Sequence, residues 1–242
     1  MSTRIDWCDE TINPLGWGCY GPTGTRDNPK PCSYCYAKRF AERNLRGCEL
    51  CRQFIPHEHP EQLELLKKWK GPKTIFVQSM GDLFHDDIPD EWIQTVFKAC
   101  EAAPQHRYLF LTKNPKVYKK DPVYSNCQIS FKKNWWFGAS ITGSESKDDI
   151  AGTMIGLAYC NNSFLSIEPI QKEIVFYEGV CLPKWIIVGA ETGNRKNKPV
   201  VCKWWIDKLV HMCLQYEMPI FMKESLRSLM GDDFKQEYPW KE

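Results

Sequence analysis

Three cysteines lie close together in one loop near the start of the chain. Cys19, Cys32 and Cys35 occur within NPLGWGCYGPTGTRDNPKPCSYCYAKRFAER, residues 13–43, which runs directly into a helix-forming segment. Three thiolates can bind three irons of a [4Fe-4S] cluster and leave the fourth iron open to another ligand. A structural cluster normally takes four cysteines. The count of three therefore predicts a cluster with one open iron.

A competing interpretation pairs two of these cysteines with two further along the chain. Cys32, Cys35, Cys48 and Cys51 form C-x2-C-x12-C-x2-C, which is close to the spacing of a four-cysteine zinc ribbon. However, the intervening stretch YAKRFAERN is helix-forming and would separate the two pairs. A zinc ribbon would also leave Cys19 without a role.

A third interpretation keeps both kinds of site. The stretch CELCRQFIPHEH offers two sulfurs and two nitrogens, from Cys48, Cys51, His57 and His59, which is enough for tetrahedral zinc. The spacing is tighter than in common zinc fingers, and the competing interpretation is two structural thiols beside two surface histidines. Cys8 is a further candidate for this site. The remaining cysteines are predicted to be buried, inert thiols: Cys100, Cys127, Cys160, Cys181, Cys202 and Cys213.

The cysteine loop resembles the radical S-adenosylmethionine (radical SAM) superfamily. CSYCYAKR resembles the second half of that signature, and NPLGWGC is similar to the stretch before the first cysteine in relatives of spore photoproduct lyase. Over nearly its whole length the chain also resembles a phage- and prophage-associated three-cysteine family. That likeness is carried by FVQSMGDLFHDDIPDEWI, APQHRYLFLTKNP, SIEP and WIIVGAETG. The resemblance implies a [4Fe-4S] cluster, S-adenosylmethionine bound to its open iron, and cleavage to a 5′-deoxyadenosyl radical.

The resemblance also implies roles for individual residues. Tyr34 would lie near the adenine, and Gly81 and Asp82 are placed like the Gly-Gly-Glu element that receives the amino group of the methionine moiety. A carboxylate there is physically sensible because it accepts hydrogen bonds from an ammonium group. Other candidates for contacts to cofactor or substrate are Ser79, Lys113, Ser140, Glu168, Glu191 and Lys223.

The loop departs from the family signature in its first spacing. Three residues ordinarily separate the first two cysteines, whereas twelve residues separate Cys19 from Cys32. Two doublings of loop length cost only about 1.2 kcal/mol of closure entropy. The Gly, Pro, Asp and Asn residues in between can fold the excess into turns.

Short apolar runs alternate with helical stretches along the rest of the chain. The predicted strands cover 74–79, 107–112, 135–141, 163–168, 185–191 and 219–224, and the predicted helices cover 90–103, 145–160 and 202–216. This alternation predicts an α/β fold, a full or partial (β/α)6–7 TIM-like barrel of parallel strands of the radical SAM type. Polar residues end nearly every strand, which predicts a shared pocket there. Residues 1–242 are expected to form a single domain, with 44–73 as an insertion on the barrel face.

Composition limits the function classes. The chain of 242 residues has a net charge of +2 and no strongly basic balance, so a nucleic-acid role must be argued from a site. It begins without an apolar signal region and contains no apolar run of about 18 residues, which predicts a cytoplasmic protein without membrane contact. Twelve cysteines in such a chain favour metal binding over disulfides.

Two functions follow as expectations. The first is a radical SAM enzyme that takes an electron from an external donor such as flavodoxin or ferredoxin; a nucleotide or nucleic-acid substrate is suggested by analogy. The second is a non-catalytic zinc-binding module that recognises nucleic acid or a protein partner through Lys30, Lys38, Arg39 and Arg43. Tryptophans are assigned to the core at Trp92, Trp185 and Trp204, and to shielding the cysteine loop at Trp7 and Trp17.

Overall fold

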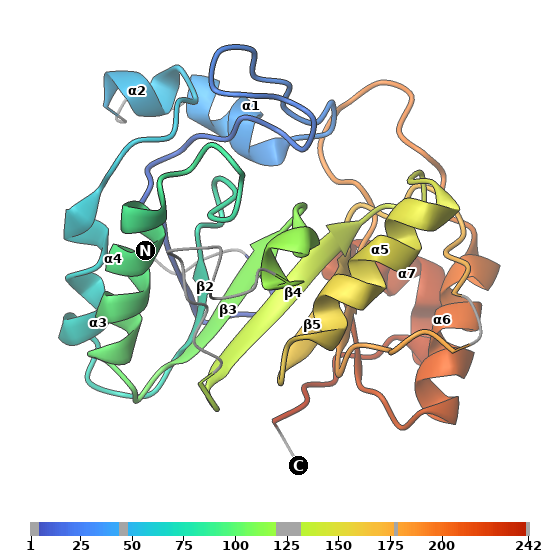
Figure 1. Ribbon diagram of the computed structural model, residues 1–242. Coiled ribbons are helices and arrows are strands. Elements are labelled where there is room, and N and C mark those ends of the chain that lie inside the picture. The colour runs from blue at the N-terminus through green and yellow to red at the C-terminus, as the bar shows by residue number, and fades with distance from the viewer. Residues whose placement is uncertain (1–4, 44–47, 120–131, 177–178, 241–242) are drawn as a thin grey trace. The chain divides into compact units, whose positions relative to one another are not determined.

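The computed structural model describes residues 5–43, 48–119, 132–176 and 179–240. The chain divides into two compact units, residues 1–136 and 137–242, and the boundary falls inside one strand. Figure 1 shows the first unit in blue to green and the second in yellow to red.

Unit 1 contains parallel strands followed by helices. Its strands are β1 (Glu10–Ile12), β2 (Thr74–Val77) and β3 (Arg107–Thr112), and β2 pairs in parallel with both neighbours. Its helices are α1 (Tyr36–Arg43), α2 (Glu49–Arg52), α3 (Leu65–Lys68) and α4 (Asp90–Glu101), with 3-10 turns η1 (Pro60–Gln62) and η2 (Pro115–Lys119).

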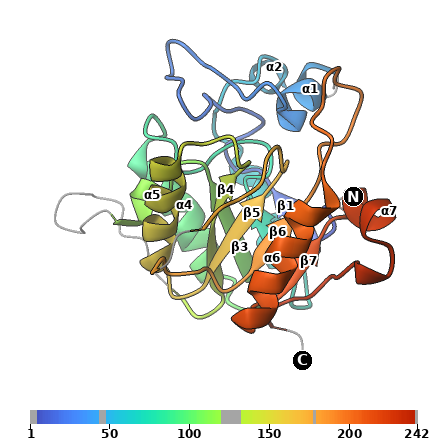
Figure 2. The same ribbon diagram turned by 90° about the vertical axis from the view of Figure 1, so that its right-hand side faces the viewer.

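Unit 2 repeats the same alternation. Strands β4 (Trp135–Ile141, which begins two residues before the boundary), β5 (Ser163–Ile167), β6 (Ile186–Val188) and β7 (Ile220–Met222) pair in parallel in chain order. Helix α5 (Lys147–Ala158) connects β4 to β5, and α6 (Lys203–Gln215) connects β6 to β7, as can be followed in Figure 2. The chain then forms η3 (Glu224–Leu226), α7 (Arg227–Met230) and η4 (Gly231–Asp233).

Aromatic side chains fill the core of each unit. In unit 1, Phe97 on α4 packs against Trp135 with ring centroids 5.1 Å apart, and Phe110 on β3 lies 5.4 Å from the same ring. In unit 2, Trp185 is fully buried and its ring lies 5.8 Å from Phe164. Such rings bury large apolar areas and dominate core energetics.

The predicted strands and helices are confirmed, with ends that differ by at most three residues. The prediction of an α/β fold with parallel strands is also confirmed. Strand β1 was not predicted, because its three residues, ETI, include two polar ones. The single-domain expectation stays a prediction, since two compact units can belong to one domain.

Some assignments to the core were wrong. Trp204 is 48% exposed, because α6 buries the face formed by Ile206, Leu209 and Cys213, and the Lys208 ammonium lies 4.9 Å from the Trp204 ring. Trp185 is buried as predicted, whereas Trp92 is half-buried.

The isolated cysteines divide into two groups. Cys100, Cys160 and Cys213 are buried, and burial raises the pKa of Cys160 and of Cys213 to about 12. These three thiols are therefore inert, as predicted. The prediction fails for Cys181, which is exposed, and for Cys202, which is half-buried. Cys127 lies outside the described residues.

Within the described ranges, no helix has both the length and the apolar character that crossing a membrane requires.

Candidate metal centres

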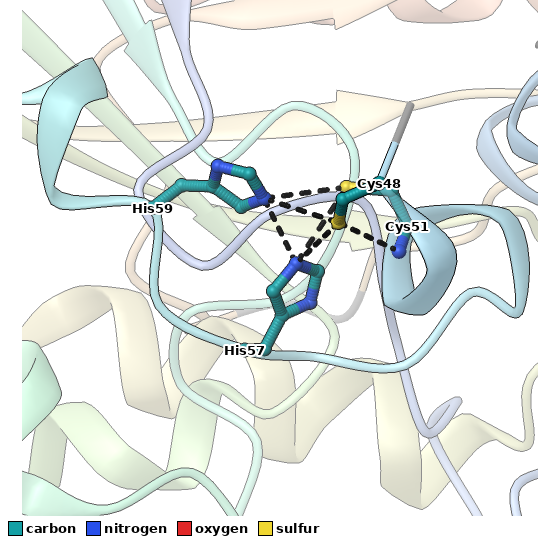
Figure 3. A group of neighbouring side chains, drawn as sticks. All are labelled: Cys48, Cys51, His57 and His59. Carbon is teal, nitrogen blue, oxygen red and sulfur yellow. Dashed lines mark hydrogen bonds between the residues drawn. The ribbon is translucent and has the colours of Figure 1, made fainter. Parts of the chain in front are cut away.

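Cys48, Cys51, His57 and His59 turn their ligand atoms toward one another (Figure 3). The four atoms all lie within 4.8 Å of one another. The Cys48 Sγ atom is 3.0 Å from His57 Nε2, and the Cys51 Sγ atom is 3.5 Å from His59 Nε2. This group of four residues, called the Cys2His2 group below, could hold a metal ion.

Local backbone structure explains how four neighbouring residues converge. Cys48 caps helix α2, and its sulfur accepts a hydrogen bond from the Cys51 N–H group at 3.4 Å, so the turn presents both sulfurs together. His57 and His59 are two residues apart in a segment without helical structure. Alternate residues of an extended segment share a face, which places both imidazoles opposite the sulfurs.

Hydrogen bonds fix the orientation of both imidazoles. His57 Nδ1 lies 2.7 Å from the Ile55 carbonyl oxygen, and His59 Nδ1 contacts the Glu61 carboxylate. Each Nδ1 faces an acceptor and therefore donates, which directs each Nε2 into the Cys2His2 group. The two Nε2 atoms are 2.8 Å apart. Both would be acceptors, so this close contact is unfavourable unless both atoms bind the same cation.

The two thiols of the group differ in acidity. The Cys51 N–H group lowers the pKa of the exposed Cys48 thiol to about 6, and hydrogen bonds with the two histidines act in the same direction. Burial raises the pKa of the Cys51 thiol. Because metals bind thiolates, the Cys48 thiol could serve as a ligand near neutral pH, whereas Cys51 would have to release a proton to bind a metal.

Residues 14–18 form a wall of this group. The Pro14 and Leu15 carbonyl oxygens accept hydrogen bonds from the backbone N–H groups of His59 (2.6 Å) and His57 (3.2 Å). Gly16 has a φ of +62°, and a Cβ atom there would lie 2.6 Å from His57 Cε1. Glycine is required because both the left-handed backbone and the close approach exclude a side chain.

The twelve residues between Cys19 and Cys32 fold back on themselves. The Lys30 N–H group donates to the Tyr20 carbonyl oxygen at 2.6 Å, and Thr25 and Asn28 exchange both of their backbone hydrogen bonds. A Cβ atom at Gly21 would lie 1.9 Å from the Lys30 oxygen. The loop is thus closed between Tyr20 and Lys30, next to the two cysteines, so its extra length does not separate them.

The closed loop is anchored to residues 85–87. The Arg26 backbone N–H group donates to the Asp87 carboxylate at 2.7 Å, and its guanidinium donates to the Asp87 carbonyl oxygen at 2.9 Å. At the base of the loop, the buried Tyr20 ring lies 5.2 Å from the His85 ring. Contacts at both ends therefore hold the loop in one position.

Cys19 and Cys35 pack against an apolar cluster formed by Ala37, Ala41, Phe54 and Met80, and Trp17 packs there with them. Gly21 and Lys38 donate backbone hydrogen bonds to the Cys19 and Cys35 sulfurs, each at 3.3 Å. Burial, together with the charge of Asp82, raises the pKa of Cys19 to about 12. The Cys35 N–H group donates to the Cys32 carbonyl oxygen at 2.9 Å, so these two cysteines lie in one turn.

Gly81 and Asp82 lie beside Cys19. Gly18 and Gly81 form a parallel bridge, and a Cβ atom at Gly81 would lie 2.2 Å from the Gly18 oxygen. The Asp82 carboxylate accepts hydrogen bonds from Thr112 Oγ1 at 2.8 Å, Lys113 N at 2.9 Å and Phe84 N at 3.0 Å. Asp82 thus ties the segment after β2 to the end of β3.

Tyr34, Ser79 and Lys113 join the same region. The Lys113 ammonium lies 5.6 Å from the centre of the Tyr34 ring, within the range of a cation–π interaction. The Tyr36 hydroxyl donates to the Ser79 carbonyl oxygen at 2.5 Å. Unit 1 therefore brings together the three loop cysteines and all five of its predicted cofactor contacts, which are Tyr34, Ser79, Gly81, Asp82 and Lys113.

Residues 2–229 match the model of a protein family described as "Protein of unknown function (DUF5131)". The chain belongs to this family. No curated protein and no solved structure matches the chain.

The remaining predicted contacts of this DUF5131 chain lie in unit 2. Ser140 on β4 is in register with Ser166 on β5, whose hydroxyl donates to Glu168 at 3.0 Å. The other Glu168 oxygen lies 2.9 Å from the Lys223 ammonium. Glu191 is paired instead with Arg195 through two contacts of 2.6 Å. Ser166, Glu168 and Lys223 therefore form one polar group at the ends of β5 and β7, and Glu191 belongs to another pair.

The zinc-ribbon interpretation is not what this DUF5131 chain adopts. Cys48 and Cys51 face His57 and His59, whereas Cys32 and Cys35 lie with Cys19 at the start of α1. Cys8 is not part of the Cys2His2 group, and its thiol is directed to the Ile5 carbonyl oxygen at 3.9 Å.

Gln78, which was not among the predicted site residues, supports the wall of the Cys2His2 group. Its side chain is 2% exposed, donates to the Gly16 oxygen at 2.9 Å and accepts from the Leu15 N–H group at 3.0 Å. It thereby fixes the backbone that contacts both histidines. A glutamine directly after the apolar run TIFV was the available signal, because a buried amide needs partners.

Replacement of Gln78 by leucine is expected to lower the free energy of unfolding by about 2–5 kcal/mol, because it leaves two buried backbone groups unpaired. Urea unfolding of zinc-loaded protein would measure this change. Gln62→Leu makes the same substitution at a half-buried position in η1 and serves as control. Equal stability of the two variants would contradict the role assigned to Gln78.

Proposed function

We propose that this protein is a radical S-adenosylmethionine enzyme whose [4Fe-4S] cluster is held by Cys19, Cys32 and Cys35. The observation that carries the proposal is the separation of sulfurs into two sites. Cys48 and Cys51 belong to the Cys2His2 group, which leaves the three thiols of residues 19–35 as the candidate cluster ligands on the segments next to Gly81 and Asp82. Three thiols leave one iron open.

The surroundings of the three thiols fit an iron–sulfur cluster. Two of the sulfurs are packed against apolar side chains and accept backbone N–H hydrogen bonds. Hydrogen bonds to sulfur and exclusion of solvent are the means by which proteins tune such clusters. The raised pKa of Cys19 means that the free thiol keeps its proton, so a metal ion must replace that proton for the thiolate to form.

When bound, the cluster and S-adenosylmethionine would supply one-electron chemistry that yields a 5′-deoxyadenosyl radical for hydrogen abstraction. The residues of the chain would bind and orient the cluster and S-adenosylmethionine. Asp82 already accepts three hydrogen bonds, and a carboxylate has about four acceptor positions, so one is left for an ammonium group. The Tyr34 ring is held by Lys113 and offers a flat face to the adenine.

The proposal extends to the fold and the partners. The proposed fold is a partial TIM-like barrel of the radical SAM type, which the alternation of parallel strands and helices within each unit supports. A nucleotide or nucleic acid is the proposed substrate, on the analogy with a DNA-lesion repair lyase. A flavodoxin or ferredoxin would supply the electron in the reducing cytoplasm.

The Cys2His2 group is proposed to bind zinc. Two thiolates and two imidazoles provide the ligand number and types of a tetrahedral structural zinc site without an open position. The orientation of both Nε2 atoms by acceptors at Nδ1 supports this assignment. A protein that bound this zinc and no cluster would instead be the non-catalytic zinc module.

Anaerobic reconstitution with iron and sulfide tests the enzymatic proposal. We expect about four irons and four sulfides per chain, and release of 5′-deoxyadenosine after addition of dithionite and S-adenosylmethionine. The control is Cys181→Ala, which removes an exposed thiol far in sequence from the loop and should behave as the unaltered chain. Fewer than three irons per chain, or no 5′-deoxyadenosine above the cluster-free background, would reject the enzyme; colourless protein with one zinc would support the module.

A further inference from the structure

The segment that carries Cys19 is attached to the Cys2His2 group by its backbone. The Pro14 and Leu15 carbonyl oxygens accept hydrogen bonds from His59 and His57. Two residues before Cys19, the Trp17 N–H group donates to the Cys51 sulfur at 3.4 Å. The chain therefore contacts three of the four ligand residues immediately before it reaches Cys19.

Close contacts restrict this attachment further. A Cβ atom at Gly16 would lie 2.6 Å from the His57 imidazole, and one at Gly18 would lie 2.3 Å from the Ile55 carbonyl carbon. Gly18 also forms a parallel β-bridge with Gly81, the residue before Asp82. Residues 14–18 are thus enclosed between the ligand-bearing segment and the segment that follows β2.

The ligand-bearing segment has little regular structure, and its buried Phe54 side chain packs against Ala37, Ala41 and Met80. Helix α2 has four residues, and residues 53–59 form no helix or strand. Helices this short are unstable by themselves in water. Four metal bonds that join Cys48 and Cys51 to His57 and His59 would therefore add a strong constraint on the surface against which residues 14–18 pack.

We propose that the metal ion in the Cys2His2 group clamps residues 14–18 and thereby sets the position of Cys19. Loss of the ion releases the histidines and Cys51, and with them the hydrogen bonds from His57, His59 and Trp17. Residues 14–18 then keep their contacts with Gln78 and Gly81 but lose those to the ligand residues, so Cys19 is held less firmly beside Asp82. The clamp rests on the contacts above and on the proposed binding of a metal by the Cys2His2 group, whereas the dependence of iron loading on zinc rests in addition on the proposed [4Fe-4S] cluster.

Hydrogen–deuterium exchange of the full chain tests the clamp without any cluster. Protein with one zinc per chain is compared with protein stripped by a chelator, both under reducing conditions and both assayed for zinc. We expect amides in 14–19 to exchange at least tenfold faster after zinc is removed, while amides in α6 stay unchanged. Equal exchange in 14–19 with complete zinc loss would overturn the clamp.

Coupling between two sites is reciprocal, so disturbing the clamp must weaken metal binding. Gly18→Ala changes no ligand but inserts a methyl group against Ile55. Competition with a chromophoric chelator should show at least a tenfold loss of zinc affinity. The matched control is Gly152→Ala in α5, where a Cβ atom meets nothing within 4 Å. Unaltered zinc affinity in folded Gly18→Ala would contradict the proposal, and the exchange experiment decides if this variant does not fold.

Iron loading separates failure of the clamp from failure of the proposed function. Zinc-loaded and zinc-stripped protein are reconstituted side by side, with several-fold less iron expected in the stripped sample. Equal iron in both would overturn the clamp and leave the enzyme standing. No iron in either would reject the enzyme, and the exchange and affinity results would still decide on the clamp.

Discussion

Cys19→Ala is expected to abolish iron binding and to leave one zinc ion per chain. A cluster loses stability when one of only three thiolates is removed, because the two that remain hold two irons. The Cys2His2 group keeps all of its ligands, since Cys19 is not among them. Elemental analysis of the reconstituted variant for iron and zinc measures both effects at once.

The second variant, Cys32→Ala, distinguishes the proposed three-cysteine site from a zinc ribbon. Under the proposed assignment it also loses iron and retains zinc, whereas a zinc ribbon through Cys32 would lose zinc. Cys202→Ala, which removes a half-buried thiol in unit 2, serves as control and should retain both metals. Retention of the full iron content by Cys19→Ala would refute the three-cysteine site.

His57→Ala is expected to lose the zinc ion under conditions in which the unaltered chain keeps it. Removing one of four ligands opens the site to water, and the Leu15 carbonyl also loses the ordered partner that the metal provides. Glu61→Gln keeps every ligand but weakens the hydrogen bond to His59 Nδ1, and such changes typically cost about 10–100-fold in metal affinity. Chelator competition should therefore rank the unaltered chain first, Glu61→Gln next and His57→Ala last.

His211→Ala provides the control for this series, because His211 is an exposed residue on α6. Its zinc affinity should equal that of the unaltered chain. Thermal unfolding of the same proteins should follow the same ranking, since a metal that binds the folded state stabilises it by mass action. Wild-type zinc affinity in His57→Ala would remove this histidine from the site.

The strands were predictable because each is a short apolar run whose burial leaves a clear pattern in the sequence, as in RYLFLT of β3. Strand β1 escaped prediction because pairing with β2, and not its own composition, makes it a strand. Trp204 was misassigned since aromatic character alone does not indicate which side of a helix faces the core. The face of α6 that packs against the core is the one that carries Ile206, Leu209 and Cys213.

The Cys2His2 group could be predicted because its four ligands lie within twelve consecutive residues. Its wall could not be predicted, since Leu15 and Trp17 contribute backbone atoms, which leave no side-chain signature. The closure of the loop after Cys19 followed from its turn residues, but its anchorage by Arg26 to Asp87 spans 61 positions of the sequence. Contacts of that separation are set by the fold as a whole.

The hydrogen bond between Lys30 and Tyr20 has a consequence for how this chain can vary. Because the hydrogen bond between Lys30 and Tyr20 closes the base of the loop, the spacing of Cys19 and Cys32 does not depend on how many residues lie between Tyr20 and Lys30. Each doubling of that number costs only about 0.6 kcal/mol. The exposed tip of the loop at Asp27 is therefore a natural point for an insertion or a grafted peptide, whereas Gly24 and Arg26 are held by their contacts with Tyr20 and Asp87.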